Sequence, residues 1–303
     1  MNKNLFAHLA VFGANLIYGM NYTLAKGPMG EDGYIQPRGF IFIRVLGALS
    51  MFWLLRLFMK KSKTKIERKD YFRLAACGLF GVCINQMLFF QGLSMTSEIN
   101  ASIMMTSNPL LVLIIAAIVI GEGVTWIKVL GIVLGGFGAT MIILYSNGST
   151  DGSSLSGDLL ILANSASYGV YLVLVKPLMK KYNSVVVISW VFLFGALFVI
   201  PLGFNQFTEI NWDMPPAIIG SVVFVVVCTT FLAYLLNIYA VSKLNTATVS
   251  AYIYLQPVLA AAFVLIVSYD ENIGGLTLEK IGFAVLIFIG VYLVGKPGKR
   301  IKA

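Results

Sequence analysis

Apolar residues fill this chain in ten long runs, separated by short polar segments. Each run is close to the roughly 20 residues that a helix needs to cross the hydrocarbon core of a bilayer. The runs are too long for strands and do not alternate apolar with polar residues. The pattern predicts an all-α integral membrane protein with ten transmembrane helices, at Leu5–Ala25, Gly39–Phe58, Leu74–Leu93, Ala101–Ile120, Trp126–Tyr145, Leu159–Val175, Val185–Phe204, Ala217–Val241, Thr246–Ser268 and Leu278–Gly295.

The composition agrees with this pattern. Of 303 residues, 58% are hydrophobic and 12% charged, and the mean hydropathy is +0.86. A soluble domain of this size could not bury so much apolar side chain, so lipid must solvate much of the surface. The chain contains neither a His-Glu-x-x-His nor a Gly-x-Ser-x-Gly motif, and no run holds paired carboxylates. We therefore expect no enzyme activity, no metal and no cofactor.

Charged residues in the loops alternate along the chain. If the N-terminus is cytoplasmic, the inner segments carry 18 basic and three acidic residues, and the outer segments carry three basic and ten acidic residues. Short cytoplasmic loops are enriched in Lys and Arg, so the pattern predicts a multi-pass protein of the cytoplasmic (inner) membrane with both termini cytoplasmic. The net charge of +9 thus indicates topology, and no nucleic-acid partner is expected.

The two halves of the chain share a few identical residues in the same order. A shift of 150 positions aligns Tyr18-Gly19 with Tyr168-Gly169, and a shift of 148 aligns Pro109 with Pro257. Each half holds five runs, an odd number, so the second half must cross the membrane in the opposite sense. The sequence predicts two inverted five-helix repeats, residues 1–146 and 157–303, joined by an extracytoplasmic linker at 147–156. Inverted repeats are typical of transporters.

Polar side chains recur on several of the predicted helices. Because polar atoms are costly in lipid, these side chains should face the bundle interior or a water-filled cavity. The alternative is that each only bonds a neighbouring helix, which is the favoured interpretation for a single Ser or Thr. The expected substrate-binding residues are Asn15, Tyr18, Tyr22, Arg44, Asn85, Gln86, Asn108, Asn164, Tyr168, Tyr171, Tyr234, Tyr252 and Gln256.

The most specific hypotheses concern Arg44 and two prolines. Arg44 lies inside the second run, where it could hold a carboxylate or phosphate of a substrate; alternatively it reaches outward, or pairs with Asp32 or a helix carbonyl. Pro109 and Pro257 occupy equivalent runs, as a pair of hinges or as static kinks.

Local motifs resemble the EamA type of the drug/metabolite transporter superfamily over nearly the whole chain. These motifs are Asn-Leu-Ile-Tyr-Gly at residues 15–19, Pro37 followed by Arg44, Ser107-Asn108-Pro109, Gly121-Glu122 followed by Gly131 and Gly138, and Gln256-Pro257. The second half departs from the pattern where Asp270-Glu271 replaces Gly-Glu. The resemblance implies a ten-helix transporter whose central cavity is lined by helices one to four and six to nine. It also implies that helices five and ten lie behind this cavity and form a homodimer contact.

These observations predict a secondary transporter, an exporter or facilitator, that moves a small organic metabolite by alternating access at a midplane cavity. Amino acids or related compounds are the expected class, and membrane lipid is the other expected partner. The runs hold no clear Asp or Glu, which favours transport driven by the gradient of the substrate itself. The alternative function is a lipid-scrambling or other membrane interaction protein that uses the same groove.

Overall fold

A computed structural model describes residues 3–29, 33–59, 66–120, 125–146, 154–241, 243, 252–268 and 277–295. All regular structure in these ranges is helical. The sequence motifs at Asp32, Gly121-Glu122 and Asp270-Glu271, and most of the linker, lie outside the described residues. The helices are α1 (Lys3–Lys26), α2 (Pro37–Phe58), α3 (Arg68–Gly78), α4 (Asn85–Leu93), α5 (Glu98–Met105), α6 (Asn108–Ile120), α7 (Trp126–Ser146), α8 (Leu155–Lys181), α9 (Ser184–Thr208), α10 (Pro216–Phe224), α11 (Ala233–Val241), α13 (Gln256–Ser268) and α14 (Leu278–Gly295).

Six helical segments of the described chain are long and apolar enough to cross a membrane. They are Pro37–Phe58, Arg68–Leu93, Glu98–Val119, Leu155–Lys181, Ser184–Thr208 and Pro216–Asn237. Large apolar side chains such as Leu57, Phe72 and Ile118 are exposed on the outside of the bundle, as expected for a surface that lipid solvates. The prediction of an all-helical membrane protein is confirmed for the part of the chain that the structure describes.

Helix boundaries follow from local chemistry. Proline opens α2 at Pro37 and α10 at Pro216, where a helix needs no amide donor. Side chains cap three other helices: Ser97 accepts from the amide of Asn100 at the start of α5, Ser154 from that of Gly157 at the start of α8, and Asn183 from that of Val185 at the start of α9. These residues are therefore well suited to the short connections that separate the long helices.

Two long helices contain wide π-helical turns. The π segment η2 (Leu79–Ile84) joins α3 to α4, and η3 (Val225–Leu232) joins α10 to α11. Two other predicted runs, Ala101–Ile120 and Thr246–Ser268, have a different break in the helix. Between α5 and α6 the hydroxyls of Thr106 and Ser107 turn back onto the Ile103 and Met104 carbonyls, each at 2.6 Å. A short 3-10 turn, η4 (Tyr252–Leu255), precedes α13.

Each predicted hinge proline follows one of these breaks. Pro109 lies in the first turn of α6, and Pro257 in the first turn of α13. At a helix start the missing amide of proline leaves no hydrogen bond unmade, so neither ring sits inside a continuous helix. The prolines inside continuous helices are Pro177 of α8 and Pro201 of α9.

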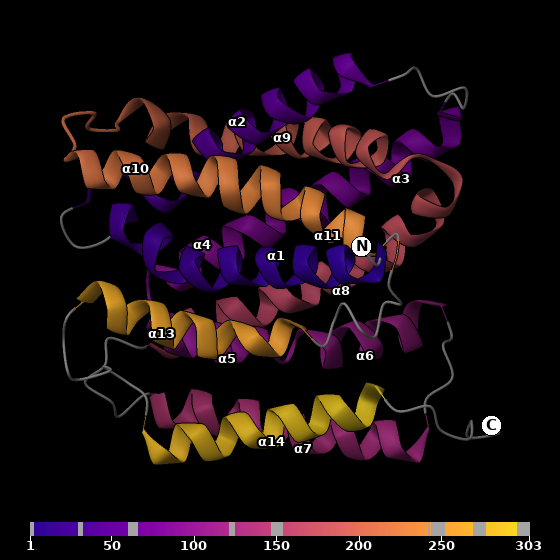
Figure 1. The fold of residues 1–303 in the computed structure, drawn as a ribbon, viewed down its shortest axis with the longest axis vertical. Coiled ribbons are helices and arrows are strands. Elements are labelled where there is room, and N and C mark those ends of the chain that lie inside the picture. The colour runs from indigo at the N-terminus through magenta and orange to yellow at the C-terminus, as the bar shows by residue number, and fades with distance from the viewer. Residues whose placement is uncertain are drawn as a thin grey trace.

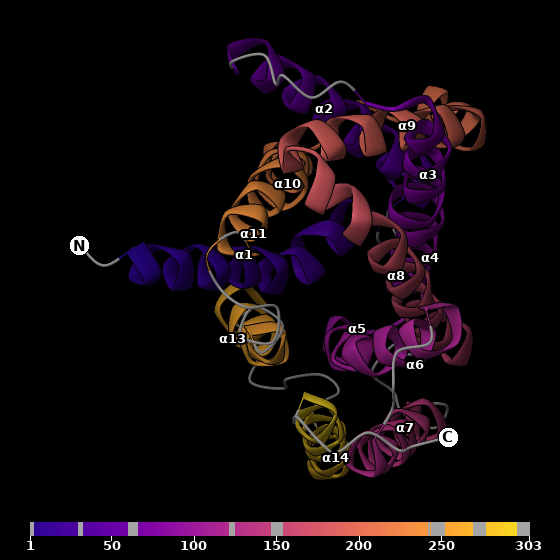
Figure 2. The same ribbon diagram turned by 90° about the vertical axis from the view of Figure 1, so that its right-hand side faces the viewer.

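The helices pack side by side, with α7 and α14 as a pair at one end of the molecule (Figure 1). The view in Figure 2 shows α1 between α11 and α13, and α8 beside α3, α4 and α6. The α7–α14 contact depends on glycine. A methyl group at Gly290 would lie 2.5 Å from the Gly131 carbonyl oxygen and 2.6 Å from the Gly135 amide nitrogen.

Candidate functional site

The polar face of α1 is bonded to α13. The Gln256 amide donates to Asn15 Oδ1 at 2.8 Å, and the Tyr22 hydroxyl donates to Gln256 Oε1 at 3.1 Å. The Asn15 amide donates to the carbonyl of Val11 in its own helix, at 2.8 Å. All three side chains are buried. Their hydrogen bonds are made within the protein, so in this conformation they join two helices.

Tyr18 lies one turn along the same face of α1 and belongs to a different group. Its hydroxyl accepts from the Asn237 amide of α11 at 3.1 Å. Tyr18 is close enough to Tyr168, Tyr234 and Arg44 to interact with them electrostatically. Tyr171 joins the same group, with its ring centroid 5.7 Å from that of Tyr168. We name Tyr18, Tyr168, Tyr171 and Tyr234 the tyrosine cluster; its members come from α1, α8 and α11.

Arg44 adds a positive charge beside the tyrosine cluster. It lies on α2 and is 6% exposed. Its Nε donates to the hydroxyl of Thr230, and that hydroxyl donates to the Val225 carbonyl within η3 at 2.8 Å. The guanidinium carbon lies 4.6 Å from the centre of the Phe90 ring. In the described part of the chain no carboxylate pairs with Arg44, so only a hydroxyl dipole and an aromatic ring stabilise its charge there.

Asparagine and glutamine line the neighbouring contact between α4 and α8. The Asn164 amide donates to the Asn85 carbonyl at 2.7 Å, and the Asn85 amide donates to the Asn164 carbonyl at 3.3 Å. Gln86 of α4 and Asn108 of α6 are also buried, and their side-chain oxygens have no partner among the described residues. Such oxygens are suited to a bound water or ligand donor.

Tyr252 lies apart from the tyrosine cluster. Its hydroxyl is 2.9 Å from His8 Nδ1, at the N-terminal end of α1. This pair joins η4 to α1. The structure thus brings five of the predicted residues, Tyr18, Arg44, Tyr168, Tyr171 and Tyr234, into one group and distributes the others over helix contacts.

Two buried acidic residues were not singled out by the sequence pattern. Asp158, in the first turn of α8, is fully buried and accepts from the Thr96 hydroxyl at 2.5 Å and the Asn100 amide at 3.4 Å. Asp70, in the first turn of α3, is also buried. A charge near the end of an apolar run resembles a loop residue in sequence, so hydropathy alone could not identify them.

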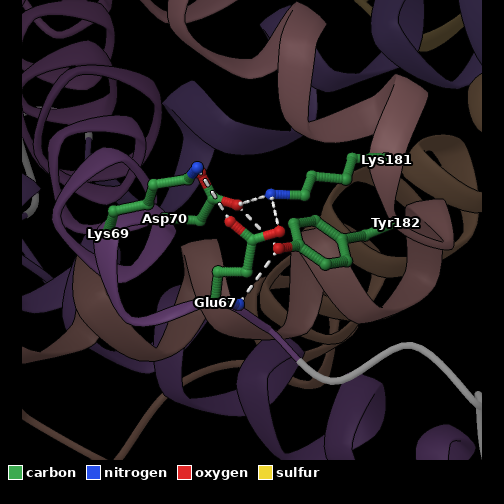
Figure 3. A network of polar contacts seen from close by, with 5 residues as sticks. All are labelled: Glu67, Lys69, Asp70, Lys181 and Tyr182. Carbon is green, nitrogen blue, oxygen red and sulfur yellow. Dashed lines mark hydrogen bonds and ion pairs between the residues drawn. The ribbon is translucent and has the colours of Figure 1, made fainter.

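Asp70 belongs to a network that joins α3 to the C-terminal end of α8 (Figure 3). Asp70 Oδ2 accepts from Lys181 at 2.8 Å and from the Tyr182 hydroxyl at 2.6 Å. Glu67 pairs with Lys181 and, at 3.0 Å, with Lys69. Hydrogen bonds from Lys181 and then Lys69 lower the pKa of the Glu67 carboxyl below its usual range. These residues hold the two helix ends together.

Among the described residues, no group of three or more His, Cys, Asp or Glu side chains is arranged to hold a metal ion. Thr230, Asn237 and Phe90 complete the surroundings of the tyrosine cluster and Arg44. The sequence showed Thr230 and Asn237 as polar positions in an apolar run, but their partners depend on contacts between distant helices.

Proteins named as transporters or exporters are similar in sequence to this chain over most of its length. An uncharacterized transporter, YyaM, of Bacillus subtilis (strain 168) is 27% identical over 95% of this chain and 93% of its own length. A protein of Streptantibioticus cattleyicolor, described as a "Probable terminal-alkyne amino-acid exporter", is 27% identical over 77% of this chain and 79% of its own length. A solved crystal structure is similar in fold, with a TM-score of 0.62 at 17% identity over 95% of both chains.

The model of the EamA-like transporter family matches this chain twice, at residues 5–144 and 155–296. Together the two matches cover most of the chain, and the apolar helices agree with a multi-pass membrane protein. The chain therefore belongs to the EamA-like transporter family, the family that its sequence motifs resemble.

Proposed function

We propose that this protein is a secondary transporter, an exporter or facilitator, that moves a small organic metabolite by alternating access at a midplane cavity. The observation that carries the proposal is the group of Arg44 and the tyrosine cluster. Helices from both halves of the chain, α1, α2, α8 and α11, contribute buried and partly buried polar side chains to one place within an apolar bundle. Polar and charged groups inside a membrane protein mark substrate pathways by default. The other predicted binding residues would border this pathway.

Ten transmembrane helices in two inverted repeats, residues 1–146 and 157–303, form the architecture we propose. The two family matches support it, and so do equivalent contacts in the two halves. A methyl group at Gly19 would meet Leu259 of α13, and one at Gly169 would meet Ile115 of α6, both at 2.7 Å. The π segments also fall at equivalent places. Pro109 and Pro257 would then be equivalent hinges.

Each half contributes its first helix to the other half. From the first half, α1 bonds α11 and α13 through Asn237 and Gln256. From the second half, α8 bonds η2 and α4 through Ser167 to the Phe80 carbonyl, at 2.6 Å, and through Asn164 to Asn85. The result is two assemblies that each combine helices of both halves. One contains α1, α11 and α13, and the other contains α8, η2 and α4. Their rotation against each other would open the cavity to either side in turn.

Lys26 links the two assemblies. From the end of α1 its ammonium donates to the Thr96 carbonyl at 2.7 Å and lies 3.7 Å from a Glu98 carboxylate oxygen. With both termini cytoplasmic, as the charge pattern predicts for the inner membrane, this link would close the extracytoplasmic side. We therefore propose Lys26 as an outer gate contact.

Amino acids or related compounds are the substrate class we propose. The name of the Streptantibioticus relative supports this class, and aromatic faces in the tyrosine cluster suit a partly apolar solute. Efflux is the direction that the same relative favours. A homodimer through α7 and α14 remains a prediction from the family resemblance.

Counterflow in proteoliposomes tests the proposal. Purified protein is reconstituted with an internal pool of each of several unlabelled amino acids, sugars and nucleosides, and uptake of the labelled solute is followed. We expect counterflow for one class, reduced in Tyr18→Phe and Tyr234→Phe and unchanged in Tyr292→Phe, whose side chain is exposed on α14. Absence of counterflow for every pool, with lipid movement in the same vesicles, would favour a scramblase instead.

A further inference from the structure

We infer that Arg44 binds a carboxylate of the transported solute, and that the substrate therefore carries a single carboxylate group beside an apolar or aromatic body. This inference rests on the proposed function and specifies the substrate class of the same site. Its basis is the surroundings of the Arg44 guanidinium.

Arg44 lacks a counter-ion among the described residues. Arg44 is 6% exposed on a helix that can span a membrane. In the ranges that the structure describes, Arg44 makes one hydrogen bond, from Nε to Thr230, and no ion pair. A buried cation without an anion is costly. A protein that keeps such a cation needs an anion that arrives from outside, or a structural use for the charge.

The Arg44 guanidinium is held along one edge and covered on one face. One edge is held by Thr230, whose hydroxyl is itself fixed on the Val225 carbonyl of η3. One face is covered by the Phe90 ring, 4.6 Å from Cζ. The two terminal nitrogens have no protein partner among the described residues. A pair of terminal N–H groups in a fixed plane matches the two oxygens of a carboxylate.

The positive charge near Arg44 limits the charge that a bound solute can carry. Three described cations are near Arg44 in the chain. Arg38 is exposed at the start of α2, Lys26 contacts Thr96 and Glu98, and Arg56 lies over the rings of Trp53 and Trp190 at 4.8 and 5.7 Å. Arg44 thus offers one positive charge. A monocarboxylate balances it, whereas a phosphate dianion would leave a negative charge in a medium of low dielectric constant. The tyrosine cluster provides aromatic faces for the remainder of the solute.

The competing interpretation is that Arg44 only ties α2 to η3 through Thr230. A structural role predicts that loss of Arg44 lowers stability equally with and without ligand. A binding role predicts that the ligand effect itself disappears. Matched pairs of compounds that differ only in the carboxylate distinguish the two roles.

The experiment measures thermal stabilisation of the purified protein by benzoate against benzamide, and by phenylalanine, alanine and leucine against their amides. We expect the carboxylates to stabilise the wild type, and Arg44→Gln to weaken their binding about tenfold or more. Arg56→Gln, which removes a cation from the same helix, should retain carboxylate binding. The benzoate and amino-acid arms distinguish a simple organic acid from an amino acid as the source of the carboxylate.

A second readout needs no variant. Phenylglyoxal modifies arginine, and mass spectrometry locates the modified residues; carboxylates should protect Arg44 in the wild type while Arg56 stays unprotected. Equal effects of acids and amides, undiminished carboxylate binding in Arg44→Gln, or a folded wild type that no carboxylate stabilises or protects would each overturn the inference. Counterflow of sugars or nucleosides alone would overturn it and leave the transport proposal standing. Carboxylate binding that depends on Arg44, without any counterflow, would support the inferred binding role of Arg44 and contradict the transport proposal.

Discussion

Asn85 and Asn164 each donate a side-chain hydrogen bond to the backbone carbonyl of the other, at 3.3 and 2.7 Å. The pair joins the first residue of α4 to α8, helices from the two halves of the chain. Removing either side chain should destabilise the protein by about 0.5–2 kcal/mol, the range for hydrogen bonds between membrane helices. Unfolding of Asn85→Ala, Asn164→Ala and the double variant in detergent measures this. Ser50→Ala, an exposed serine bonded within its own helix, is the control. Additive effects of the two substitutions would contradict coupling across the pair.

Lys26→Met should loosen the contact between α1 and the segment that begins α5. The Lys26 ammonium is partly exposed, so the link contributes about 0.5–1 kcal/mol, equivalent to a two- to fivefold rise in local opening. Hydrogen exchange of the amides of residues 98–105 should increase accordingly, whereas α9 should be unaffected. Lys180→Met, at an exposed position of α8, should leave both segments unchanged. If residues 98–105 exchange at the wild-type rate, Lys26 is not a gate contact.

Glu67 should make stability depend on pH. Its pKa is lowered in the folded protein by Lys181 and Lys69, so its contribution is complete above the unfolded pKa of about 4.3 and is lost as the pH falls through the lower folded value. The wild type should have a higher Tm than Glu67→Gln at neutral pH, and the difference should shrink below about pH 4. The carboxyl is partly exposed, so salt should also reduce the difference. A difference that grows on acidification would contradict the assigned ion pairs.

The α7–α14 contact should tolerate a methyl group at some glycines and not at others. Gly290→Ala places the methyl against backbone atoms of Gly131 and Gly135, so the helices must separate, at a cost of about 1–3 kcal/mol. Gly136→Ala, in the same α7 helix, meets nothing within 4 Å and should be neutral or stabilise by up to about 1 kcal/mol through helix propensity. Thermal unfolding of the two variants tests the difference. Equal effects would show that close approach at Gly290 is not required.

The sequence by itself determined the fold class and the family. Apolar runs of membrane length are a local property, because lipid selects for them residue by residue, and they predicted the all-helical membrane protein that the structure describes. The repeated motifs around Tyr18-Gly19 and Pro109 indicated the family that the comparison identified.

The tertiary structure decided which polar residues meet. Hydropathy shows that Asn15, Tyr18 and Tyr22 should avoid lipid, but it cannot distinguish a neighbouring helix from a cavity. In the structure Asn15 and Tyr22 bond Gln256, while Tyr18 joins the tyrosine cluster. The burial of Asp158 and the position of Arg44 beside Thr230 likewise follow from contacts between segments that are 62 and 186 residues apart. Such pairings depend on how helices cross in space, and no local pattern of apolar and polar residues contains that information.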